Sequence, residues 1–129
     1  MKKFLIGLMA VLALAAPVAM AAPAQATTGS QRQAIGSAQD YLRSMPFSKA
    51  GLIHQLSSRY GEGFSRADSV YAVNHIRVSW KAQAVRSARQ YLRSMHFSCS
   101  GLIHQLESRY GEQFLHWQAV YGARHTSAC

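Results

Sequence analysis

Apolar residues recur at helical spacing in two stretches of the chain that lie fifty residues apart. Within each stretch they follow one another at steps of one, three and four residues, which is typical of one face of an amphipathic helix about three turns long. No stretch alternates between apolar and polar residues over the length of a strand, so the pattern predicts an all-α fold. The predicted inner face consists of Ala34, Ile35, Ala38, Tyr41, Leu42 and Met45 in the first stretch, and of Ala84, Val85, Ala88, Tyr91, Leu92 and Met95 in the second.

Capping residues and a proline indicate where this first helix begins and ends. Ser30 followed by Gln33 has the spacing of a capping box, and Ser79 can cap the corresponding helix of the second stretch. Pro46 pushes Met45 out of the helical region of backbone space. We therefore expect the proline to end the first helix.

Two shorter helices are predicted after it. Ser48 is placed to cap the second helix, which should stop near Tyr60-Gly61, where glycine can adopt the left-handed conformation. Ser65 and Asp68 have capping-box spacing at the start of the third helix. The predicted inner positions are Leu52, Ile53 and Leu56 in the second helix, and Val70, Tyr71 and Asn74 in the third.

The two stretches are copies of one unit. Residues 34–76 and 84–126 align without a gap, and about 25 of the 43 pairs are identical. A fixed period of this size indicates one supersecondary unit used twice, and units too small to bury a core alone are expected to pack on each other. Repeated phenylalanines would plug the first turn and repeated glycines would let backbones approach closely. The anchors interpreted in this way are Phe47, Gly51, Tyr60, Gly61, Phe97, Gly101, Tyr110 and Gly111.

The second copy departs from the first at its third helix, where Leu115 stands in place of Ser65. Loss of a serine cap costs about 1 kcal/mol of local helix stability. We expect Trp117 to compensate by packing, and the C-terminal end to be less regular than the first copy.

The first 26 residues have the three-part layout of a secretory signal peptide. Two lysines precede an apolar run over residues 4–16, which is shorter than the roughly 20 residues of a membrane-spanning helix. An uncleaved N-terminal anchor is the alternative. We predict a signal peptide over 1–26, a first three-helix repeat over 27–78 and a second over 79–129.

The chain is strongly basic, with a formal net charge of +9 at pH 7. Such a charge favours anionic partners: an acidic wall polymer, lipid head groups, an acidic protein face or nucleic acid. A helix-turn-helix outline would favour DNA inside a cell, but export makes nucleic acid an unlikely physiological partner. We expect the mature chain to be a monomer.

Repeated arginines form the candidate binding surface. Arg43 and Arg93 occupy matching positions, as do Arg59 and Arg109. They are interpreted either as solvated charges, in part paired with a glutamate of the same copy, or as a duplicated recognition surface. Two weak copies of one site on a rigid frame gain avidity when the target is itself repetitive.

The two cysteines, Cys99 and Cys129, are expected to pair after export into an oxidising compartment. The bond would staple the second copy, and an intermolecular disulfide is the alternative. No HxxxH or CxxC grouping occurs, carboxylates are few, and the repeated His54 and His104 are interpreted as exposed helix residues. We therefore predict no metal, no cofactor and no enzymatic activity.

The motif YL..M.FS..GLI.QL.SRYGE.F occurs twice, and the segment VSWKAQAVRSARQYL joins the copies. Over residues 34–126 the chain resembles the Ltp-type host cell surface-exposed lipoprotein family. The resemblance implies a tandem of helix-turn-helix-like three-helix units and a place on the surface of Gram-positive bacteria. Some prophage-encoded members act in superinfection exclusion, in which an incoming phage is stopped from delivering its DNA.

The resemblance makes a phage superinfection-exclusion protein the expected function. It would obstruct DNA delivery by binding a phage tail or DNA-entry component, or an envelope component such as an acidic cell-envelope polymer. The alternative is a secreted envelope-interaction module that binds acidic wall polymer or another anionic surface and has no antiphage role. Because no cysteine precedes Cys99, we expect a secreted or cell-surface protein that is not lipid-anchored.

Overall fold

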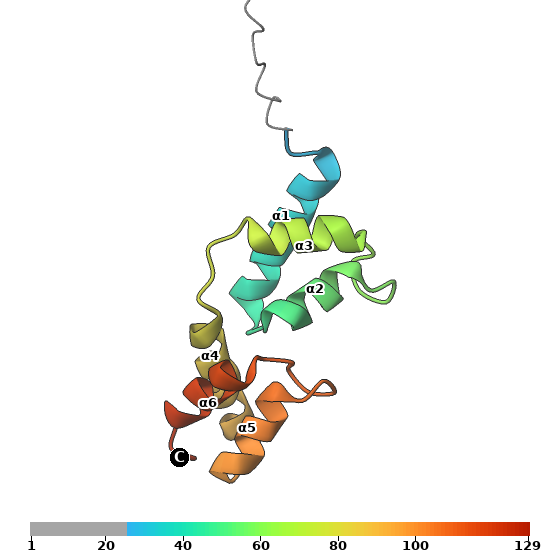
Figure 1. Cartoon of the computed structure of the whole chain (residues 1–129). Coiled ribbons are helices and arrows are strands. Elements are labelled where there is room, and N and C mark those ends of the chain that lie inside the picture. The colour runs from blue at the N-terminus through green and yellow to red at the C-terminus, as the bar shows by residue number, and fades with distance from the viewer. Residues whose placement is uncertain (1–25) are drawn as a thin grey trace, which may run out of the picture.

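Within residues 26–129, six α-helices form two successive three-helix units (Figure 1). The computed structural model describes residues 26–129, so the predicted signal peptide lies outside the described residues apart from Ala26. The all-α prediction is confirmed, because this part of the chain contains no strand. The first unit consists of α1 (Gly29–Ser44), α2 (Lys49–Ser57) and α3 (Arg66–Asn74), and the second of α4 (Trp80–Ser94), α5 (Cys99–Glu107) and α6 (His116–Arg124).

Serine caps begin four of the six helices, and α1 begins earlier than the sequence predicts. Ser48, Ser65, Ser79 and Ser98 each accept a backbone N–H of the first turn that they precede. The α1 cap is Thr28, whose side chain accepts from the Gln31 N–H while the Gln31 amide accepts from the Thr28 N–H. The assignment of this cap to Ser30 was wrong, since the threonine offers the same spacing two residues earlier.

α1 ends directly before Pro46, with Met45 outside the helix as predicted, but a proline is not required for this end. Met45 is extended after α1, and Met95 is equally extended after α4, where His96 takes the place of the proline. In both units the next phenylalanine packs edge-on against the preceding tyrosine, with ring centroids 5.6 Å apart for Tyr41–Phe47 and 5.7 Å for Tyr91–Phe97. In each unit, the corner between the first and second helices is therefore held by this aromatic pair and by the serine cap that follows.

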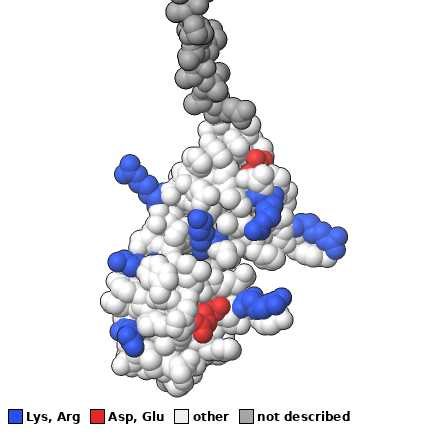
Figure 2. All heavy atoms as spheres, viewed as in Figure 1, with Lys and Arg blue, Asp and Glu red and all other residues white. Residues whose placement is uncertain are grey.

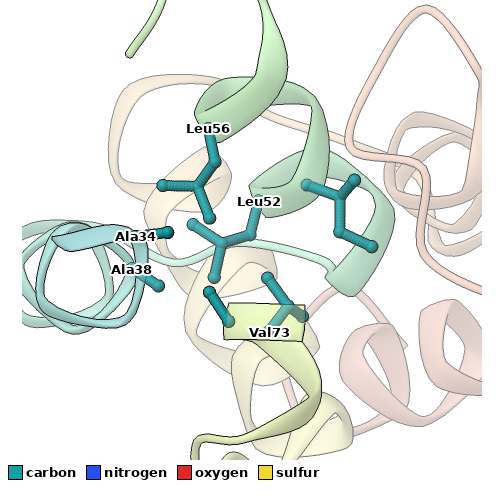
Figure 3. Packing of buried hydrophobic residues seen from close by; sticks show 7 residues of the cluster. Ala34, Ala38, Leu52, Leu56 and Val73 are labelled. Atoms are coloured by element: carbon teal, nitrogen blue, oxygen red, sulfur yellow. The ribbon is translucent and has the colours of Figure 1, made fainter. Parts of the chain in front are cut away.

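Each unit buries its own core. In the first unit, leucines from α2 fill the space beside small residues on α1 and α3 (Figure 3). In the second unit Gly122 allows α6 to press against α4, because a Cβ there would lie 2.7 Å from the Ala84 carbonyl oxygen. The cores consist of Ala34, Ala38, Leu52, Ile53, Leu56, Ala72 and Val73 in the first unit, and of Ala84, Ala88, Leu102, Leu106, Phe114, Ala119 and Ala123 in the second.

Two of the predicted inner faces need correction. The buried side of α3 is formed by Ser69, Ala72 and Val73, whereas Asn74 is exposed. The methionines that close the α1 and α4 stripes are also exposed, because the backbone has already left the helix at each of them.

The units do not pack on a common core, contrary to the sequence expectation. Trp80, the first residue of α4, packs against the first core, and the other named contacts across the joint are polar. The Ser48 hydroxyl donates to the Glu112 carbonyl, and the Phe47 N–H donates to the Gln83 side-chain oxygen at 3.3 Å. Each three-helix unit is therefore stabilised by its own small apolar cluster, and mainly polar contacts join it to its neighbour.

The third helix of the second unit is as long as that of the first, so the expected irregularity was wrong. Leu115 provides no side-chain cap, but the buried Gln118 reaches back and accepts the Leu115 N–H at 3.1 Å. Trp117 does not compensate, since 57% of it is exposed.

The predicted disulfide joins Cys99 and Cys129 within the chain, with the two Cα atoms 4.8 Å apart. It ties the end of the segment after α6 to the first residue of α5. Across the described residues, we find no helix with the length and hydrophobicity to cross a bilayer.

Candidate functional site

The connections between the second and third helices of each unit form two matching turns, which we call the Arg–Tyr turns (residues 58–63 and 108–113). In the first, the N–H groups of Gly61 and Gly63 both donate to the Ser58 carbonyl at 3.0 Å. In the second, Gly111 and Gln113 donate to Ser108 at 3.0 and 3.1 Å. These bonds close each turn on itself and give both turns the same backbone shape.

A glycine holds each turn against its own helix. A Cβ on Gly61 would lie 2.2 Å from the Gln55 carbonyl oxygen, and one on Gly111 would lie 2.2 Å from that of Gln105. The sequence predicted a left-handed glycine here, and that was wrong. The positive φ occurs two residues later, at Gly63 (70°) and at Gln113 (62°).

Gly51 and Gly101 play a smaller part than the sequence suggested. A Cβ on Gly51 would lie 3.0 Å from the Ser48 hydroxyl oxygen and 3.5 Å from the Glu112 carbonyl, and one on Gly101 would lie 2.9 Å from the Ser98 hydroxyl. Both glycines mainly make room for the serine cap. Close approach of another backbone concerns Gly51 alone, and there only at ordinary contact distance.

A hydrogen-bonded triad braces each turn from inside the unit. In the first, the Tyr41 hydroxyl donates to Glu62 at 2.5 Å and accepts from the Gln55 amide at 3.2 Å. In the second, the Tyr91 hydroxyl donates to Glu112 at 2.6 Å and accepts from Gln105 at 3.1 Å. The glutamate of the turn is thereby fixed to the first helix of its unit.

These contacts raise the pKa of both tyrosines. For Tyr41 the hydrogen bond to Glu62 is the largest cause and burial is the second. For Tyr91 burial comes first and the bond to Glu112 second, and together they raise the pKa to about 12. Both hydroxyls therefore remain protonated donors at physiological pH.

At the tip of each turn an arginine and a tyrosine project into solvent. Tyr60 is 86% exposed and Tyr110 is 89% exposed. The guanidinium carbon of Arg59 lies 4.8 Å from the Tyr60 ring centroid, and that of Arg109 lies 5.1 Å from the Tyr110 ring. The tyrosines interpreted as anchors thus stand on the surface and contribute nothing to either core.

The Arg–Glu pairing considered from the sequence is absent from the turns. In the first turn the Arg59 guanidinium donates to the Tyr60 hydroxyl at 2.7 Å, while Glu62 is taken by Tyr41. Tyrosine and arginine are the residue types that most often dominate protein–protein binding energy. Each unit therefore presents a two-residue contact tip on a closed turn, and the two connections project on the same side in Figure 1.

The four candidate arginines do not form one surface. Arg59 and Arg109 belong to the turns, whereas Arg43 and Arg93 lie near the ends of α1 and α4. Arg43 pairs with Asp40 one helical turn earlier, and both side chains are exposed. The structure therefore places Arg43 and Arg93 on a different part of each unit from Arg59 and Arg109. Their spacing in the sequence did not show this separation.

The repeated histidines lie apart from any metal-like cluster. His54 and His104 are exposed on α2 and α5, as predicted. Nδ1 of His75 lies 2.7 Å from the Tyr71 carbonyl oxygen and its ring stacks on that tyrosine, and the pair Tyr121–His125 repeats this. Within residues 26–129 no group of three or more His, Cys, Asp or Glu could hold a metal ion.

Comparison with known proteins identifies the architecture. The family model described as host cell surface-exposed lipoprotein matches residues 30–76 and, a second time, residues 79–125. Among solved structures the chain is similar to Ltp, a superinfection exclusion protein from the Streptococcus thermophilus temperate phage TP-J34. The TM-score is 0.71 at 26% sequence identity, over 79% of this chain and 100% of that one. A search of curated proteins finds no match.

Proposed function

The chain belongs to the host cell surface-exposed lipoprotein family, and from this premise we propose that it is a cell-surface protein of the superinfection-exclusion kind. It would bind a phage or envelope component and so obstruct the delivery of phage DNA. The observation that carries the proposal is the match of both units to the superinfection exclusion protein of phage TP-J34, which the chain covers over its whole length.

The Arg–Tyr turns are the proposed contact points. Each tip offers an aromatic ring and a guanidinium whose exposed area can be buried by a partner, and the triad beneath it limits the ordering cost of binding. Two tips on one chain bind a repetitive target with an avidity that exceeds either contact alone. A protein assembly with repeated subunits, such as a phage tail, has the required repetition.

The test is a phage challenge on a susceptible host that expresses the chain, with adsorption and DNA delivery scored separately. We expect normal adsorption and blocked delivery. The double variant Y60S/Y110S should restore delivery, since it removes both rings from exposed positions. Each single variant should retain part of the block, because one tip remains.

The matched control is W117S, which removes an exposed aromatic ring outside the turns. It should leave the block unchanged. Normal delivery across a broad phage panel in the presence of the unaltered chain would refute the exclusion role. A block that survives in Y60S/Y110S would refute the turns as its contact points while leaving the role intact.

A second candidate function is envelope binding without an antiphage role. The net charge of +9 favours it, because acidic wall polymers attract a basic surface. It differs from exclusion in its prediction for the challenge, because phage infection would then proceed normally.

A further inference from the structure

Each unit carries a shallow cavity beside the end of its third helix, and the two cavities occupy matching positions. The first, of about 530 Å³, is lined by Arg43, His75 and Arg77 among others. The second, of about 540 Å³, is lined by Arg89, Arg93 and His125. In both cavities, therefore, an arginine and a histidine stacked on a tyrosine line the wall at matching positions.

A third cavity of about 290 Å³ lies at the joint and adjoins the cavity of the second unit. It is lined by Arg86, Arg89 and Arg93 from α4 and by Ser44 and Pro46 from the corner after α1. Arg89 and Arg93 also line the cavity of the second unit. The Arg86 guanidinium donates to the Leu42 carbonyl at 3.1 Å, which holds α4 against the end of α1.

This third cavity and the cavity of the second unit share Arg89 and Arg93 and form one continuous surface, which we call the basic track. Its arginines are Arg86, Arg89 and Arg93. No aspartate or glutamate lines either cavity, and none of these three arginines forms an ion pair within the described part of the chain. On the face drawn in Figure 2, lysine and arginine side chains are spread over both units and outnumber the acidic ones.

Three features select the chemistry of the ligand. Planar guanidinium groups bind phosphate oxygens in pairs, so uncompensated arginines favour phosphate over a neutral sugar. Two open cavities in series favour an extended polymer over a single ion. No phenylalanine, tyrosine or tryptophan lines the track, and Tyr121 covers one face of the His125 ring, so the track lacks the aromatic platforms with which proteins bind the bases of single-stranded nucleic acid.

We propose that the basic track binds a linear phosphodiester polymer of the cell wall, of the poly(alditol phosphate) class. The track crosses the joint, so one polymer strand contacts both units at once. This binding holds the protein at the wall and does not depend on the proposed contact of the Arg–Tyr turns with a phage component. The two surfaces use different arginines, which allows them to be tested separately.

The experiment measures binding of the full, oxidised chain to fluorescein-labelled poly(glycerol phosphate) by fluorescence anisotropy at several salt concentrations. The double variant R89Q/R93Q removes two arginines that each line two cavities. It should weaken binding by about tenfold or more and reduce the slope of log affinity against log salt by about 1.4, since each lost phosphate contact to a single-stranded polymer changes it by about 0.7. The matched control R59Q/R109Q removes the same charge from the Arg–Tyr turns, and it should weaken binding by less than about twofold.

Each result bears on the proposal. Equal losses in the two double variants would overturn it, since binding would then follow net charge and not the track. Tighter binding to single-stranded DNA or to phosphatidylglycerol vesicles than to the wall polymer would overturn the choice of partner. An assay of retention on isolated walls separates it from the exclusion role: R89Q/R93Q should lose retention, whereas Y60S/Y110S should keep it.

Discussion

Tyr41 and Tyr91 show how the same residue in two copies acquires different surroundings. Both hydroxyls bridge a turn glutamate and a helix glutamine, but burial outweighs the glutamate in raising the pKa of Tyr91. The Tyr91 hydroxyl donates a hydrogen bond to the Glu112 carboxylate, and such a bond is stronger than one between two neutral groups. The second triad is therefore the better place to measure what the network contributes.

We expect Tyr91→Phe to lower the free energy of unfolding by about 1.5 kcal/mol at pH 7, because Glu112 loses its hydroxyl donor. Urea denaturation measures the change. Tyr110→Phe serves as the control, since that side chain is 89% exposed, and it should have no effect on stability. Equal midpoints for the two variants would show that the triad adds nothing to stability.

The raised pKa of Tyr91 also predicts a pH dependence. A tyrosine in the unfolded chain ionises near pH 10, whereas in the folded chain the pKa is about 12. The folded state therefore favours the neutral phenol, and this stabilisation is complete below pH 10 and is lost as the pH rises toward 12. The unfolding midpoints of the unaltered chain and of Tyr91→Phe should converge over this interval, and a constant gap would contradict the assignment.

Gln113 is a second residue at which the copies differ. Its φ of 62° is left-handed, and the matching residue of the first turn is Gly63 with a φ of 70°. A side chain in this region costs about 1 kcal/mol relative to glycine. We expect Gln113→Gly to raise the free energy of unfolding by about that amount, and Gly63→Ala to lower it. Thermal unfolding tests both, and a loss on Gln113→Gly would show that the glutamine side chain has a contact of its own.

Residues were best predicted where their role is local. The serine caps need only a hydroxyl at the correct distance along the chain, and Ser48, Ser65 and Ser79 were placed correctly. The role of Tyr60 was mistaken, because repetition alone does not distinguish a residue kept for packing from one kept for display. The adjacent Arg59 was the available signal, since its charge marks this turn as exposed.

At the scale of the helix, the second unit compensates for the missing serine cap of α6 without using Trp117. Gln118 supplies the return bond of a capping box, while the hydroxyl that should accept the opposing N–H is missing at Leu115. The sequence indicated the missing serine but not the buried glutamine, because the burial of Gln118 depends on how α6 lies against its unit. The inner face of α3 was misjudged for the same reason.

Leu115→Ser should stabilise the chain by about 1 kcal/mol, since it completes the capping box. Little apolar burial is given up, because Leu115 is 61% exposed. Ser65→Ala is the matched loss in the first unit and should destabilise by a similar amount. Chemical denaturation of both variants checks the pair, and a destabilised Leu115→Ser would mean that the leucine packs in solution.

At the scale of the whole molecule, two small cores meet at a polar joint. The sequence correctly indicated the number of units, but it could not show that each would bury its own core. That outcome depends on how closely helices approach, as where Gly122 lies against Ala84. The disulfide is confined to the second unit, so the two cores differ in what keeps them folded.

Removal of the disulfide should therefore affect one unit and spare the other. The bond closes a segment with a sequence separation of 30 residues, which corresponds to about 3 to 4 kcal/mol in the chain-entropy account. In C99S/C129S we expect amide hydrogen exchange to accelerate in α4–α6 while α1–α3 keep their protection. Uniform acceleration across all six helices would show that the joint couples the units into one cooperative structure.

The same bond has a consequence under mechanical load. A chain pulled from its two ends carries tension along its backbone, and the disulfide lets that tension pass directly between Cys99 and Cys129. The segment between them has a sequence separation of 30 residues, which at full extension is a contour length of about 100 Å. While the bond is intact this segment cannot extend, so a stretched chain lengthens only by unfolding the first unit and α4.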